Sequence, residues 1–146
     1  MKSLLGKLGV ILIGLVIFGY AEGWGADWKY ISENNLGMDF YDVGSISYPS
    51  DNIVRVWVKT IWKPQGISGM VKDLGKSYEN VEFSKGLREY DCREKKGRTL
   101  SMIDISKDGS VIANYTVPDP LLRWSFVSPD SVDETSFKVV CSQAKN

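Results

Sequence analysis

The fold of this chain depends on residues 87–98, LREYDCREKKGR, which contain one of only two cysteines in the 146-residue sequence. The first half of this stretch alternates, which is typical of a β-strand with Tyr90 and Cys92 on one face and Glu89 and Asp91 on the other. The second cysteine, Cys141, lies near the C-terminus. How the chain is organised therefore depends on whether the two cysteines are bonded.

The N-terminus has the pattern of a secretory signal peptide. Lys2 and Lys7 precede an apolar run, Leu8–Phe18, and small residues follow it. We expect residues 1–25 to be a signal peptide, cleaved near residues 21–26, and residues 26–146 to form the mature domain. A retained membrane anchor is the alternative, but the apolar run is shorter than the roughly 20 residues that a spanning helix needs. We expect no membrane span after signal removal.

Export predicts a disulfide between Cys92 and Cys141, because two cysteines in a small domain are usually bonded in an oxidising compartment. The two residues lie too far apart in sequence for a CxxC redox motif. Their bond closes a loop of about 50 residues, which the chain-entropy model values at roughly 4 kcal/mol.

The composition excludes several classes of function. Eighteen basic residues balance eighteen acidic ones, so nothing indicates binding to nucleic acid or to an anionic membrane surface. The sequence has no histidine, which excludes His-based triads, metal sites and proton shuttles. No activated nucleophile, metal-ligand set or Gly-rich phosphate loop is evident. We therefore expect neither enzymatic activity nor a cofactor. An enzyme with this sequence would have to use carboxylates or Lys and Ser side chains for catalysis.

The clearest strand is Ile53–Trp62, in which Val54, Val56 and Val58 alternate with polar or aromatic residues. Lys107-Asp108-Gly109 predicts the turn of a hairpin. Residues 104–109 also resemble the first half of a calcium loop, but Tyr115 stands where that loop needs a bidentate Glu, so the turn is favoured. The remaining strands are expected at residues 27–31, 38–43, 87–93, 98–106 and 110–117, with a short edge segment at 123–127.

A C-terminal helix is predicted after Ser131, which forms a capping box with Glu134. Phe137, Val140 and Cys141 then fall on one apolar face, so the helix is expected to dock on the sheet. Residues 68–81 predict either a further short helix or a long loop with one helical turn. The predicted class is α+β: one antiparallel sheet of five or six strands with the C-terminal helix packed on it.

A basic cluster is the main candidate for a binding site, and acidic residues interleave with it. One interpretation is a solvated strand edge that is partly self-neutralised. The other is a docking patch for an acidic or polyanionic partner, helped by exposed aromatic residues. The cluster consists of Arg88, Arg93, Lys95, Lys96 and Arg98.

Residues in six segments, taken together and in order, resemble the bacterial surface-adhesin protein E family. These segments are Phe40–Asp42, Val54–Lys59, Glu89–Cys92, Asp108–Val111, Trp124–Ser131 and Val139–Cys141. The resemblance implies an exported domain with an antiparallel sheet, a C-terminal helix and a disulfide at Cys92 and Cys141. It also implies an adhesin of the kind that binds host matrix and serum proteins. The sequence departs from that adhesin in lacking a lipoprotein cysteine.

We therefore expect an exported non-enzymatic binding module with a protein partner. Its location would be periplasmic, secreted or at the cell surface, and its oligomeric state stays open. The alternative is a periplasmic structural or accessory component of an envelope assembly.

Overall fold

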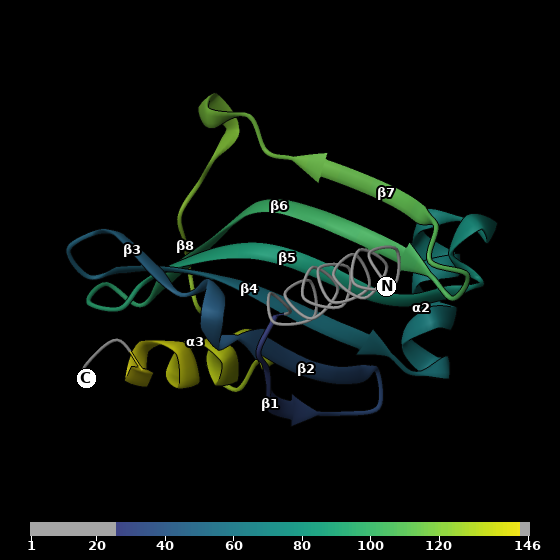
Figure 1. Cartoon of the computed structure of the whole chain (residues 1–146), viewed down its shortest axis with the longest axis horizontal. Coiled ribbons are helices and arrows are strands. Elements are labelled where there is room, and N and C mark those ends of the chain that lie inside the picture. The colour runs from purple at the N-terminus through teal and green to yellow at the C-terminus, as the bar shows by residue number, and fades with distance from the viewer. Residues whose placement is uncertain (1–25, 144–146) are drawn as a thin grey trace, which may run out of the picture.

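The computed structural model describes residues 26–143. Eight strands form one antiparallel sheet in the order β1-β2-β4-β5-β6-β7, with β3 beside β4 and β8 beside β6 (Figure 1). The predicted α+β class and antiparallel sheet are confirmed, but five or six strands was too few. The strands are β1 (Trp28–Glu33), β2 (Gly37–Asp42), β3 (Ser47–Ser50), β4 (Ile53–Trp62), β5 (Val81–Asp91), β6 (Lys96–Ser106), β7 (Val111–Thr116) and β8 (Ser125–Phe126).

The two shortest strands lie beside longer ones: β8 falls within the short edge segment expected at residues 123–127, whereas β3 was not expected. β3 pairs with β4 through Ser47 and Ser50, with an irregularity between them, and it contains Pro49. β8 pairs with β6 through only two residues, Ser125 and Phe126. Segments this short carry no periodicity of their own, because tertiary pairing alone defines them as strands.

Two α-helices and three short 3-10 helices complete the fold. The two α-helices lie at opposite ends of the sheet (Figure 1). The helices are α2 (Pro64–Leu74) and α3 (Val132–Gln143), and the 3-10 helices are η1 (Val43–Ser45), η2 (Lys76–Tyr78) and η3 (Asp119–Leu121).

A short helix was one of the two predictions for residues 68–81. The observed helix, α2, begins four residues before that interval and ends at Leu74, within it. Pro64 occupies the first turn of α2, where its missing N–H costs nothing. Gly75 follows the helix with φ of 109°, a conformation that L side chains rarely adopt. The remainder of the interval is therefore not α-helical, and β5 begins at Val81 rather than at the predicted Leu87.

The core lies between α3 and one face of the sheet, here called the helix face. Val54 and Val56 of β4 and Tyr90 of β5 are almost completely buried against Phe137 and Val140 of α3. The predicted amphipathic docking of the C-terminal helix is thus confirmed. No helix of residues 26–143 is long and apolar enough to cross a membrane. The predicted signal peptide lies outside the described residues.

The predicted disulfide is confirmed: Cys92, directly after β5, is bonded to Cys141 in α3. The predicted cap of α3 is confirmed in part. The Glu134 amide donates to Ser131 Oγ at 3.1 Å, but the Glu134 carboxylate accepts from the Asp130 amide rather than from that of Ser131.

Candidate binding sites on the two faces of the sheet

The predicted basic cluster does not form one surface. Arg88 points to the helix face, where its guanidinium donates to Asp133 at 2.8 Å and to Thr99 at 2.6 Å. Arg98 points to the opposite face and pairs with Glu89 at 2.8 Å. The register explains the separation, since successive residues of one strand point to opposite faces.

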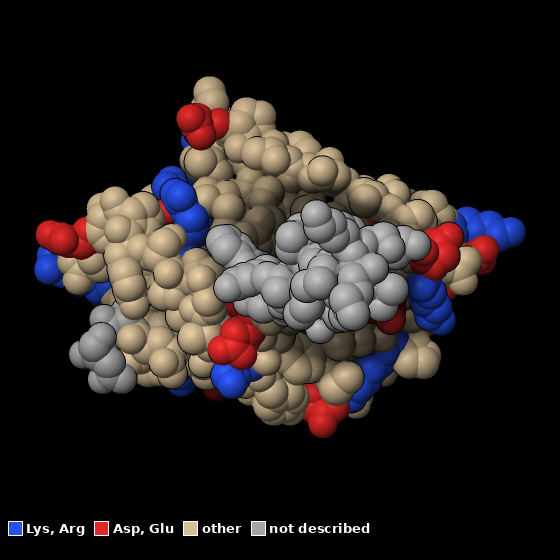
Figure 2. All heavy atoms as spheres, viewed as in Figure 1, with Lys and Arg blue, Asp and Glu red and all other residues tan. Residues whose placement is uncertain are grey.

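The other three members of the cluster lie in or beside the turn between β5 and β6. The side chains of Arg93 and Lys95 are exposed. The Lys96 ammonium lies 4.8 Å from the centroid of the Phe126 ring, which is 73% exposed. Charged side chains lie around the outline of the molecule, with both signs mixed, in the view of Figure 2. The turn is thus the part of the cluster that stays available to a partner.

Glu89 is only 1% exposed and has two arginine partners. It accepts from Arg55 at 3.1 Å and from Arg98 at 2.8 Å. Trp124 covers Arg98, with the guanidinium 4.3 Å from the ring centroid. These contacts satisfy a buried carboxylate, so they stabilise the fold and leave Arg98 committed within the domain.

The face opposite α3 carries a second group of cations among aromatic rings, which we call the aromatic–lysine face. Its members come from β1, β2, β4 and β5. The Lys59 ammonium lies 4.5 Å from the Trp28 centroid, 5.5 Å from that of Phe40 and 5.7 Å from that of Phe83. Lys85 lies 5.4 Å from Phe83. The members are Trp28, Tyr30, Phe40, Lys59, Phe83 and Lys85.

Pairing across the sheet brings these side chains together. Phe40 is opposite Lys59, and Lys59 is opposite Lys85. Tyr30 stands opposite Phe40, with their ring centroids 6.0 Å apart in an edge-to-face arrangement. The four residues therefore form one row across β1, β2, β4 and β5.

The electrostatics of this face favour an anionic partner. Burial lowers the pKa of Lys59, and the charge of Lys85 lowers it further, while Glu82 acts in the opposite direction. Within residues 26–143, neither Lys59 nor Lys85 forms an ion pair. Two ammonium groups held close together beside aromatic rings attract carboxylates while offering apolar contact area.

Sequence reasoning identified parts of the aromatic–lysine face without assembling it. Trp28 and Lys59 lie in strands predicted at residues 27–31 and Ile53–Trp62, but neither residue was named as part of a site. Phe83 and Lys85 were missed because their strand was expected to begin at Leu87. Alternation of apolar and charged residues from Val81 onward is the signal that could have found them.

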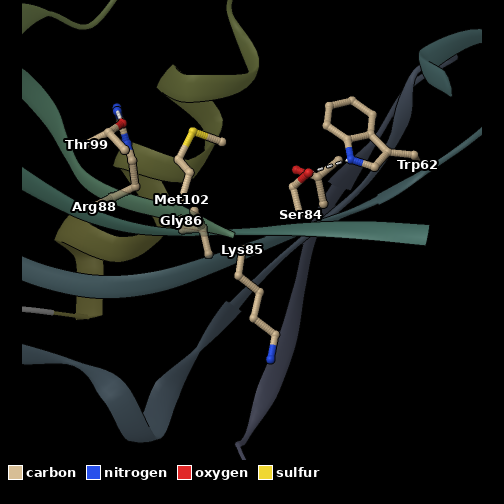
Figure 3. A pocket seen from close by; sticks show the side chains of 9 residues that line it. Trp62, Ser84, Lys85, Gly86, Arg88, Thr99 and Met102 are labelled. Carbon is tan, nitrogen blue, oxygen red and sulfur yellow. Dashed lines mark hydrogen bonds between the residues drawn. The ribbon is translucent and has the colours of Figure 1, made fainter. Parts of the chain in front are cut away.

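The helix face is hollowed beyond the end of α3. One cavity of about 170 Å³ lies over Val58 and Gly86, between Trp62 and Arg88 (Figure 3). Trp62 Nε1 donates to Ser84 Oγ at 2.8 Å. Lys85 leaves the sheet on the side opposite to these side chains (Figure 3), which places its ammonium on the aromatic–lysine face.

A polar network borders this hollow. Ser84 donates to Asp104, and the Tyr78 hydroxyl donates to the same carboxylate at 2.9 Å. Burial and the neighbouring Asp104 raise the pKa of Tyr78. Because Asp104 is engaged with these donors, it is not part of a calcium loop with Asp108, which instead accepts from Ser110 in the predicted turn. No group of three metal-ligating side chains occurs within residues 26–143.

The family model for surface-adhesin protein E matches residues 28–142. The chain belongs to the surface-adhesin protein E family. The match covers nearly all of the sheet and α3, including both cysteines and the aromatic–lysine face. The family is one of surface adhesins, which agrees with the expected exported or cell-surface location. No curated protein matches the sequence.

Solved structures of Haemophilus influenzae protein E are similar in fold. Crystal form II of that protein aligns with a TM-score of 0.52 at 12% identity, covering 84% of this chain and 95% of that chain. The crystal structure of protein E from non-typeable Haemophilus influenzae gives a TM-score of 0.49 at 12% identity, covering 80% of this chain and 77% of that chain. At such low identity the first alignment shows a shared fold and nothing about a shared site.

Proposed function

We propose that this member of the adhesin E family is an exported, non-enzymatic binding module that binds a protein partner through its aromatic–lysine face. The observation that carries the proposal is the position of Lys59 and Lys85 among the rings of Trp28, Phe40 and Phe83. Aromatic residues supply much of the binding energy of protein interfaces, and desolvated cations select an acidic counterpart. The partner segment would present carboxylates next to apolar side chains.

The exposed turn residues of the basic cluster are a second candidate contact. Arg93 and Lys95 are exposed and Lys96 is partly so, and none of the three forms an ion pair within residues 26–143. Replacing all three with Ala should weaken partner capture without unfolding the domain. Arg88 and Arg98 are excluded from this variant because their internal ion pairs would confound it with loss of stability.

Site-specific photo-crosslinking in the native host cells tests the proposal. A benzoyl-phenylalanine placed at Tyr30 lies on the aromatic–lysine face, and one placed at Tyr115 lies on the other side of the sheet. The two sites are matched, because both are tyrosines that are 56% exposed. We expect a crosslinked protein from Tyr30 and none from Tyr115, and the Lys59→Met/Lys85→Met variant should lose the adduct. Equal adducts from both sites would contradict the proposed surface.

Identifying the crosslinked protein distinguishes the two kinds of function. A soluble extracellular protein supports the adhesin-like role. A component of an envelope complex supports the alternative, a periplasmic structural or accessory protein. Fractionation of the same cells with intact-mass analysis tests export, because cleavage near residues 21–26 gives a defined mass.

A further inference from the structure

A second hollow on the helix face lies between Trp62 of β4 and Val132 at the start of α3. It has a volume of about 210 Å³, and its walls are mainly apolar. The carboxylate side chain that lines it is Asp39 of β2, next to Thr60. Leu36 and Val132, both exposed apolar residues, also line it.

Asp39 is a buried carboxylate without a cationic partner within residues 26–143. It is 9% exposed and accepts one hydrogen bond, from Thr60 Oγ1 at 2.6 Å. Burial raises its pKa, and the Thr60 hydrogen bond only partly opposes that effect. Carboxylates in such positions are normally paired, since burial of an unpaired charge is costly. The missing counter-charge has to come from outside the described domain if Asp39 is to be stabilised as an anion.

Two cations on β5 and on the segment after β4 are already engaged. Arg88 is paired with Asp133 at 2.8 Å, and Lys63 is paired with Glu33 at 2.9 Å. Arg88 and Asp133 line the adjoining cavity on the α3 side, which Asp39 also lines. Neither pair therefore supplies a charge to Asp39.

Trp62 forms an aromatic wall that separates this hollow from the one in Figure 3. Its indole is held at two points. Nε1 donates to Ser84, and the six-membered ring packs under Gly66 of α2, where an added Cβ would lie 2.8 Å from the ring and would also collide with the Leu36 carbonyl. The wall is thus a fixed aromatic surface, which attracts organic cations.

We propose that this hollow, the Asp39 cavity, binds the primary ammonium group of a lysine side chain presented by the protein partner. This inference rests on the proposed function and names one anchor of the partner. Asp39 supplies the counter-charge, Trp62 supplies an aromatic surface, and Leu36 and Val132 contact the methylene groups. A volume of about 210 Å³ is well above the roughly 10–15 Å³ that a single water needs on the same measure, so the hollow has room for four methylenes and an ammonium.

Titration with Nα-acetyl-L-lysine N-methylamide, followed by NMR of the Trp62 indole, tests the cavity without the unknown partner. The norleucine analogue lacks the ammonium group and ends in a methyl group at Cε, so it is the uncharged control. We expect saturable binding of the lysine amide and binding of norleucine weaker by about tenfold or more, the loss of one charge-assisted hydrogen bond. Equal binding of the two compounds would overturn the proposal.

The matched variants are Asp39→Asn and Asp108→Asn. Asn at position 39 keeps an acceptor for Thr60 but removes the charge, while Asp108 lies in the exposed turn after β6. Only Asp39→Asn should lose the preference for lysine, by about tenfold. Binding to the wild-type domain should also fall as the pH drops through the raised pKa of Asp39. An unchanged preference in Asp39→Asn would refute the assigned role.

Two further results separate possible failures. Saturable binding of n-butylamine without binding of the lysine amide would overturn the assignment to a protein lysine. Loss of lysine binding in Asp39→Asn with the Tyr30 crosslink retained supports the cavity as a separate anchor. If the lysine amide fails to bind the wild-type domain while the Tyr30 crosslink still forms, this inference is refuted and the proposed function stands.

Discussion

Removing the disulfide should destabilise the domain by a large share of its total stability. The bond joins Cys92 and Cys141, 49 positions apart, so the unfolded chain is constrained over most of its C-terminal part. The chain-entropy model gives about 4 kcal/mol for a loop of this length. Typical domains are stable by about 5–15 kcal/mol, so the loss is expected to be easily measurable.

The length of the domain sets the expected decrease in melting temperature. A domain of about 120 residues unfolds with an entropy near 250 cal/mol/K, so 1 kcal/mol corresponds to about 4 °C. The Cys92→Ala/Cys141→Ala variant should therefore melt about 12–16 °C below the oxidised wild type. Phe137 and Val140 still bury an apolar face against the sheet, so α3 should remain docked at 25 °C.

Thermal unfolding followed by circular dichroism measures this effect under four conditions. These are the oxidised wild type, the wild type with reductant, and the double variant with and without reductant. We expect the last three conditions to agree and to lie below the first. A decrease of less than about 4 °C would refute the loop-closure argument, because it would correspond to about 1 kcal/mol. A reductant effect on the double variant would expose an artefact of the assay.

The other predictions concern substitutions at single positions. Glu89→Gln should lower the free energy of unfolding by about 2–4 kcal/mol in denaturant titrations, because two guanidinium groups lose a buried counter-charge, although one of them is partly solvated. Gly97→Ala should destabilise by about 1–3 kcal/mol, because its Cβ would lie 3.2 Å from the buried Tyr90 ring and 2.9 Å from the Arg88 guanidinium, which hydrogen bonds hold in place. Gly69→Ala, with nothing within 4 Å, should stabilise α2 by about 0.5–1 kcal/mol. Lys85→Met should raise the pKa of Lys59 in an NMR titration of the lysine side chains, since one of the causes that lower it is removed.

Sequence patterns predicted those elements whose periodicity is intrinsic to the chain. β4 alternates from Val54 to Val58, and α3 has both a cap and an apolar face, so their positions agreed with expectation. The pairing of Cys92 with Cys141 could be predicted because the chain has only two cysteines and export would place them in an oxidising compartment. By contrast, the N-terminal part of β5 was not predicted: Val81 was placed at the end of the interval of residues 68–81, and residues 82–86 were assigned to no element.

The candidate site was harder to predict because it depends on register between strands. Lys59 and Lys85 lie far apart in sequence, and only the pairing of β4 with β5 makes them neighbours. Conversely, charged residues that are close together in sequence are separated when they lie in a strand, since successive side chains point to opposite faces. Arg88 and Arg98 demonstrate this. Arg88 pairs with Thr99 and Arg98 pairs with Glu89, so the two arginines belong to successive pairs of the β5–β6 ladder and point to opposite faces.

The same alternation explains how a chain with no net charge can present two surfaces of different character. Strand β4 contributes Lys59 to the aromatic–lysine face and its neighbour Thr60 to the Asp39 cavity. One strand thus positions a cation on one side and helps to hold an uncompensated carboxylate on the other. A one-residue slip of β4 would exchange these side chains, so the register that buries Val54 and Val56 also fixes the charge presented by each face.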